Sequence, residues 1–165
     1  RERILNADAT TVSVGHYEGG VYNNYWVLIF SYPENSHTED YRQEVLNLVN
    51  AQRAKYGLTA LEMGDDALTA AAQTRAEEIS VVNSHVRPDG SKCFTVLKDY
   101  GVTDTPTGEN AAWGSVSPEE VVNAWMNSEG HRANILNPEA RKMSVGYYYN
   151  SNSTWGHQWI QIFTK

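Results

Sequence analysis

The chain has 165 residues, 41% of them hydrophobic, with ten tyrosines and five tryptophans, and its formal net charge is −7. This length fits one ordinary domain with a short appendage, and the apolar content suffices for a core. The acidic balance argues against nucleic acid and anionic membranes as partners, because both bind basic surfaces, and no apolar run reaches the roughly 18 residues of a transmembrane helix.

The two other compositional signals concern redox state and processing. Cys93 is the single cysteine in the sequence, so no intrachain disulfide forms, and a lone cysteine is typical of a small buried hydrophobe. The chain begins with Arg1 and not with Met, so we expect a trimmed fragment in which a missing signal peptide says nothing about secretion.

The predicted elements change character near residue 37. Residues 1–35 predict a short helical turn and then a β-hairpin, and residues 33–36 mark a boundary. Beyond it, the pattern predicts helices from about residue 38 to Gly57, from Asp65 or Asp66 to about 82, at 92–100 and from Ser117-Pro118 to about Asn127, with extended segments at 107–113, 143–149 and 157–163. This order indicates an α+β layered domain at residues 38–165.

The N-terminal unit, residues 1–37, repeats the end of the chain. Residues 1–17 align without a gap to residues 132–148 and are identical at nine positions, and both copies continue through a turn into an aromatic-led strand. The copy begins after the position of His131, so it carries no second set of the candidate site residues. It is either the tail of a preceding domain or a duplicated hairpin kept for packing.

Three polar stretches carry residues suited to chemistry: SHVRPDG with His85, TGENAAWG with Glu109, and NSEGHRANIL with Glu129 and His131. We expect each at a loop or at the end of an element. Imidazoles bind zinc and copper, and a carboxylate binds metal, orients water or acts as a base. The alternative is structural, with the two histidines capping loops and Glu109 holding backbone amides.

The order of these motifs, followed by VGYYY and a terminal WIQIF, resembles the bacterial branch of the CAP superfamily, whose members are also called SCP-like domains. The resemblance covers about residues 38–165. It implies a three-layer α-β-α sandwich, here with an extra N-terminal β-hairpin, and a cleft in which His85 and His131 bind zinc or another divalent cation. It also implies a secreted or cell-surface location.

The acidic residues of the family's site are matched less completely in this chain. Glu109 matches the glutamate of the family's G-E-N motif, and Ser84, Asn110 and Ser128 are expected to line the cleft around it. Eukaryotic relatives carry a further glutamate where this chain has Ser128, so Glu129 is the candidate to replace it, and both Glu109 and Glu129 are candidate catalytic residues. Two histidines and water make an incomplete zinc shell, which loses metal as the imidazoles protonate.

Three functions follow. The first is an extracellular binding module whose cleft takes a divalent metal and a small ligand, lipid, glycan or peptide. The second is a metal-assisted hydrolase or peptidase with Glu109 as its base, and the third is a spacer in a larger surface protein.

The apolar faces of the duplicated hairpin raise a separate expectation. An isolated hairpin is marginal in water, so residues 10–31 should form an antiparallel hairpin resembling residues 143–163 and be covered by a CAP domain. That domain is the chain's own, that of a strand-exchanged dimer, or a tandem repeat neighbour.

Overall fold

The computed structural model describes residues 11–31 and 38–165, and the chain divides into two compact units, Arg1–His37 and Thr38–Lys165. The helical turn predicted within residues 1–10 and the boundary predicted at residues 33–36 lie outside the described residues. Each unit is described by itself.

The first unit contains an antiparallel hairpin, as the sequence predicts. Strand β1 (Thr11–Glu18) pairs with β2 (Asn24–Ser31), from Thr11 opposite Ser31 to Glu18 opposite Asn24. The turn between the strands contains Gly19 and Gly20, both with positive φ, which is the conformation that glycine adopts without a steric penalty.

The second unit contains a four-stranded sheet between helices. The elements are α1 (Thr38–Lys55), β3 (Glu62–Met63), α2 (Asp66–Glu78), a 3-10 turn η1 (Cys93–Thr95), α3 (Val96–Asp99), β4 (Pro106–Trp113), α4 (Pro118–Asn127), α5 (Glu129–Ile135), β5 (Lys142–Asn150) and β6 (Gly156–Thr164). The strand order is β3-β5-β6-β4, with β3 parallel to β5 and the other pairs antiparallel. Strand β4 therefore forms one edge of the sheet.

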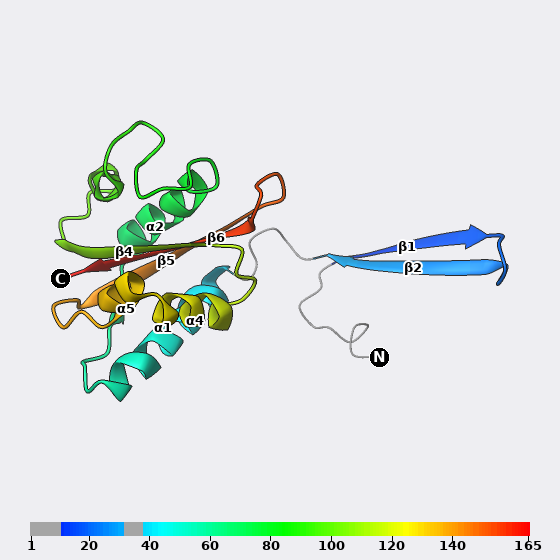
Figure 1. The fold of residues 1–165 in the computed structure, drawn as a ribbon. Coiled ribbons are helices and arrows are strands. Elements are labelled where there is room, and N and C mark those ends of the chain that lie inside the picture. The colour runs from blue at the N-terminus through cyan, green and yellow to red at the C-terminus, as the bar shows by residue number, and fades with distance from the viewer. Residues whose placement is uncertain (1–10, 32–37) are drawn as a thin grey trace. The chain divides into compact units, whose positions relative to one another are not determined.

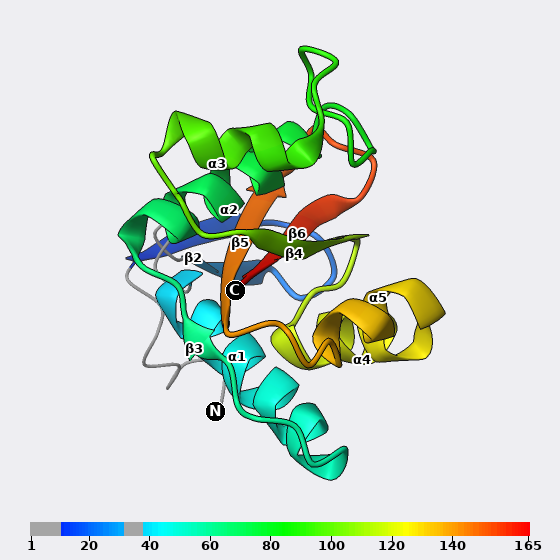
Figure 2. The same ribbon diagram turned by 90° about the vertical axis from the view of Figure 1, so that its left-hand side faces the viewer.

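Helices cover both faces of this sheet. Figures 1 and 2 show α2 and α3 on one face and α1, α4 and α5 on the other, which confirms the three-layer α-β-α prediction. Two buried clusters match the two interfaces: one joins α1 and α4 to β5 and β6, and the other joins α2 and α3 to β4 and β6. Trp125, Val121 and Val122 of α4 lie in the first cluster.

Local sequence signals explain several of the helix boundaries. The side chain of Asp65 accepts a hydrogen bond from the backbone N–H of Leu68 and caps α2, and Ser117 caps α4 with Pro118 in the first turn. The sequence did not predict β3, which is two residues long, or α5, whose start at Ser128-Glu129-Gly130 has the composition of a loop.

Candidate functional site at the edge strand

Glu109 and Asn110 occupy the middle of β4 and are both buried. The expectation that this motif lies at a loop or at the end of an element is therefore wrong. Successive side chains of a strand point to opposite faces of the sheet. Glu109 accordingly bonds with α2, and Asn110 bonds with α5.

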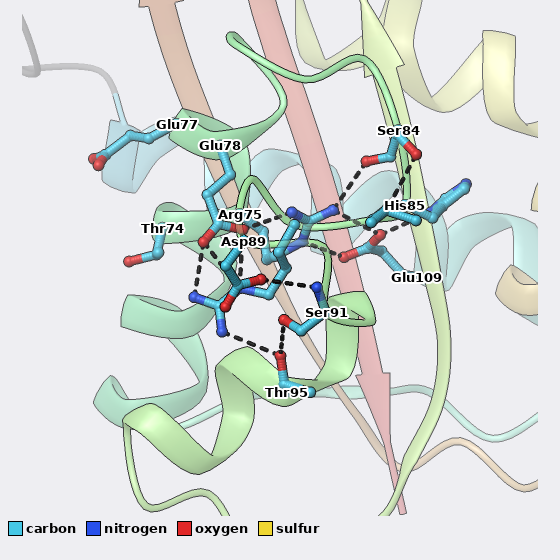
Figure 3. Close-up of polar contacts among 12 residues, drawn as sticks. Thr74, Arg75, Glu77, Glu78, Ser84, His85, Asp89, Ser91, Thr95 and Glu109 are labelled. Carbon is cyan, nitrogen blue, oxygen red and sulfur yellow. Dashed lines mark hydrogen bonds and ion pairs between the residues drawn. The ribbon is translucent and has the colours of Figure 1, made fainter.

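The carboxylate of Glu109 is held by Arg75 of α2. Arg75 Nε donates to Glu109 Oε2 at 3.0 Å and Nη2 donates to Oε1 at 3.3 Å, while Nη1 donates to Glu78 Oε2 at 2.6 Å (Figure 3). The side chains of Arg75 and Glu109 are 0% and 2% exposed. A charge buried this deeply requires a partner of opposite sign, so the pair fixes the orientation of the carboxylate.

His85 binds the same carboxylate from the loop after α2. Its Nδ1–H donates to Glu109 Oε1 at 2.7 Å, while its side chain is 54% exposed. Figure 3 shows Glu109 between Arg75 and His85. This bond fixes the tautomer of the ring and leaves Nε2 as the nitrogen available to a ligand. Among the described residues, the side chains of Arg75 and His85 donate hydrogen bonds to this carboxylate, whereas the structural alternative expects backbone amides.

The loop that carries His85 is tied to the helices by a second arginine. Arg87 donates to Glu78 at 2.8 Å and to Asp99 of α3 at 2.7 Å. The backbone carbonyl of His85 accepts a hydrogen bond from the N–H of Cys93 at 3.1 Å, and the N–H of Gly90 closes a turn by donating to the Arg87 carbonyl. These contacts hold the backbone of His85 in place although its ring is half exposed.

His131 lies in α5, on the opposite face of β4. Its backbone carbonyl accepts a hydrogen bond from Asn110 Nδ2 at 3.1 Å, and Asn110 Oδ1 accepts one from Asn134 Nδ2 at 2.8 Å. Asn110 Nδ2 also donates to Gln161 Oε1 at 3.0 Å. Two adjacent residues of β4 thus position the two histidines: Glu109 holds the ring of His85, and Asn110 holds the backbone at His131. We call His85, Glu109 and His131 the edge-strand site.

Electrostatics give the two histidines different proton affinities. The hydrogen bond to Glu109 raises the pKa of His85, against the opposing effects of burial and the Arg75 charge. Burial lowers the pKa of His131, and the positive charge of His85 lowers it further. Burial alone would raise the pKa of Glu109, but the hydrogen bonds from His85 and Arg75 outweigh it, so that pKa is lowered.

The other predicted site residues, Ser84, Ser128 and Glu129, lie in the loop after α2, at the junction of α4 and α5, and in the first turn of α5. The carbonyl of Ser84 accepts from Arg75 Nη2 at 3.2 Å and its hydroxyl accepts from the Val86 N–H at 3.0 Å. Ser128 is the junction between α4 and α5. Glu129 is exposed in the first turn of α5, and helix residues two apart do not face each other, so a shared role for Glu129 and His131 stays a prediction.

The sequence motifs do not point to Arg75, which holds the central carboxylate of the site. The signal was available, because an arginine among alanines on a buried helix face needs an acidic partner. Which acid it contacts depends on the packing of α2 against β4. Cys93, by contrast, is buried as expected, and burial raises the pKa of its thiol to about 11.

Nε2 of His85 is the ring nitrogen that the bond to Glu109 leaves available to a metal ion. Within residues 11–31 and 38–165, no three His, Cys, Asp or Glu side chains come together as a group able to hold a metal ion. Both oxygens of Glu109 accept hydrogen bonds, from Arg75 and from His85. A metal ion would have His85 Nε2 and His131 as protein ligands and water in its remaining positions.

The fold and these motifs define a family. A sequence profile described as CAP, cysteine-rich secretory protein family, matches residues 46–163. The chain belongs to this family, as the resemblance of its motifs predicts.

Two relatives from Bacillus subtilis (strain 168) support this assignment. The uncharacterized protein YkwD is 42% identical over 122 residues, which are 73% of this chain and 47% of YkwD. The uncharacterized membrane protein YlbC is 33% identical over 115 residues, or 67% of this chain and 33% of YlbC. The chain thus spans about half the length of one relative and a third of the other.

Solved structures show the same fold. An extracellular protein containing a SCP domain from Bacillus anthracis has a TM-score of 0.68 and 24% identity, over 85% of this chain and 47% of that one. An outer surface protein from Borrelia burgdorferi has a TM-score of 0.64 and 26% identity, over 79% of this chain and 95% of that one. In the described part of this chain, no helix has the length and apolar character needed to cross a membrane.

Proposed function

We propose that residues 38–165 form an extracellular binding module whose edge-strand site takes a divalent metal ion, and that the ion with its surroundings captures a small ligand, a lipid, a glycan or a peptide. The observation that carries the proposal is the 2.7 Å bond from His85 Nδ1 to Glu109, which directs Nε2 of a half-exposed ring away from the protein's own carboxylate. The extracellular and surface proteins among the structural neighbours support the location.

Arg75 holds the carboxylate of Glu109, and Glu109 holds the ring of His85. Such a series of contacts is typical of a metal-binding histidine whose ring is fixed by a carboxylate. A carboxylate that accepts the second N–H of a ligating histidine fixes the ring and raises its basicity. Arg75 in turn fixes the carboxylate, so a rigid buried pair stands behind the exposed ring. The lowered pKa of His131 keeps its imidazole neutral at physiological pH, which is the form that binds metal.

The alternative function, a metal-assisted hydrolase with Glu109 as base, receives less support. A general base must reach the proton that it removes, whereas both oxygens of Glu109 accept hydrogen bonds from its neighbours. We therefore propose that Glu109 positions His85. A bound divalent ion would supply a Lewis-acidic centre for an anionic or carbonyl group of the ligand.

The test is zinc titration by calorimetry. Wild-type protein should bind one equivalent, and the double variant His85→Ala/His131→Ala should lose at least 100-fold in affinity. His16→Ala, which removes a histidine from the hairpin, is the matched control and should bind as wild type. The proposal fails if the double variant binds zinc like wild type. Peptide cleavage that is abolished by a chelator and by Glu109→Gln would instead establish the hydrolase.

A further inference from the structure

The close packing of helix α2 requires a glycine at position 146 of strand β5. Gly146 of β5 lies beneath α2, and a Cβ atom built on it would collide with the backbone carbonyl of Ala72. Its φ is not in the left-handed region, so the backbone conformation does not call for glycine. The close approach of α2 therefore explains Gly146.

Gly15 occupies the same position in the N-terminal hairpin. In the paired strands, Gly15 lies opposite Val27 and Gly146 lies opposite Ile160. Every pair of β1–β2, from Thr11–Ser31 to Glu18–Asn24, has its counterpart in β5–β6, from Lys142–Thr164 to Tyr149–His157. The hairpins share one register and differ in the length of the turn.

The hairpin itself gives no reason for Gly15. A Cβ atom at this position would have nothing within 4 Å, and the φ of Gly15 is not in the left-handed region either. Glycine in the interior of a strand weakens it and often marks a site where another backbone approaches closely. Gly15 thus leaves space for the backbone of a packed helix, as Gly146 does for the backbone at Ala72.

The two faces of the hairpin carry the same pattern of side chains as β5–β6. On the face that packs on α1 in β5–β6, Trp26 stands for Trp159, and the ring pair His16–Trp26, at 4.2 Å between centroids, corresponds to Tyr147–Trp159 at 4.5 Å. On the face that packs on α2, Ile29 stands for Ile162. Trp26 and Ile29 are 64% and 61% exposed, whereas Trp159 and Ile162 are fully buried.

We infer that β1–β2 is the closing hairpin of a second CAP body, one equivalent to residues 38–131 that is supplied by a neighbouring repeat of the same polypeptide. An α2-like helix covers Gly15, and an α1-like helix covers Trp26. A second copy of this chain is a poorer occupant, because its own body already holds β5–β6 in this place. The inference does not depend on metal binding at the edge-strand site.

The test uses the full 165-residue chain. A variant frees the chain's own residues 38–131 from β5–β6, so that β1–β2 can bind there. Gly146→Val drives a side chain into the backbone of α2, so that β5–β6 no longer fits and the body becomes a substitute for the neighbouring one. Hydrogen exchange followed by mass spectrometry then reports each hairpin separately. We expect at least a tenfold slowing of exchange in β1–β2 of this variant, with fast exchange in β5–β6.

Two further variants complete the comparison. Gly15→Val/Gly146→Val should protect neither hairpin, and Gly15→Val alone should leave the protection of β5–β6 as in wild type. The inference is overturned if Gly146→Val leaves β1–β2 unprotected, whether or not the body stays folded, or if Gly15→Val/Gly146→Val protects β1–β2 equally well. Protection of β1–β2 in a wild-type dimer would instead make a second copy the occupant and would also overturn it.

Discussion

Arg75 and Glu109 form a buried ion pair in which two guanidinium nitrogens reach the two carboxylate oxygens, at 3.0 and 3.3 Å. The pair joins the last turn of α2 to the middle of an edge strand, and His85 binds the same carboxylate from the loop after α2. It therefore links the packing of the domain to the orientation of the candidate ligand.

Removing one partner of this pair should destabilise the domain. Arg75→Met leaves the carboxylate of Glu109 buried with His85 as its remaining cationic partner, and such losses cost about 3–5 kcal/mol. Urea denaturation measures the free energy of unfolding. Arg75→Met/Glu109→Gln should recover at least about 1 kcal/mol of it, because no uncompensated charge is left. A cost below about 1 kcal/mol for Arg75→Met would show that the pair does not hold the two elements together.

The contribution of His85 to stability should depend on pH. The folded pKa of His85 is raised above its ordinary value of 6.5 by Glu109, so its contribution is fully present below pH 6.5 and is lost as the pH rises through the folded pKa. The difference in unfolding free energy between wild type and His85→Gln should shrink over that range. Because the ring is half exposed, the difference stays below about 1 kcal/mol. A difference that grows with pH would contradict the assignment of the proton.

The pH dependence of the zinc affinity should report the same protonation of His85. A proton and a metal ion compete for Nε2 of His85, so the raised pKa predicts that affinity begins to fall at a pH above 6.5 as the solution is acidified. Glu109→Gln removes the bond that raises this pKa, and its profile should move to lower pH. The variant should also bind zinc about 10–100-fold more weakly at pH 8, because the ring loses its orienting partner. Calorimetry at several pH values measures both effects, and an unchanged profile in Glu109→Gln would contradict them.

Trp125 tests the core under α4. Its side chain is fully buried, so Trp125→Ala should cost about 3–5 kcal/mol of unfolding free energy. Its indole N–H has no hydrogen-bond partner among the described residues, so Trp125→Phe loses no bond and should cost less than about 2 kcal/mol. Thermal or urea unfolding separates the two variants. Equal costs for both variants would show that filling the space of the indole with an aromatic ring is not what stabilises the buried cluster.

Much of this fold follows from local signals. The caps at Asp65 and Ser117, and the turn at Gly90, depend on residues next to them in the sequence. Strands β5 and β6 are buried on both faces over most of their length. The site was less predictable, because it depends on distant residues. Nothing near Glu109 indicates that Arg75 reaches it across the interface between α2 and β4, or that Asn110 contacts Asn134 of α5.

The central claim is that His85 and His131 bind one metal ion together. Ring-nitrogen NMR of histidine during a zinc titration tests it most directly. We predict that His85 Nε2 and one ring nitrogen of His131 shift together and saturate at one equivalent of zinc, while His85 Nδ1 stays protonated toward Glu109. The rings of His16 and His157 should remain unchanged. A shift at His85 without one at His131, or equal shifts at all described histidines, would contradict the claim.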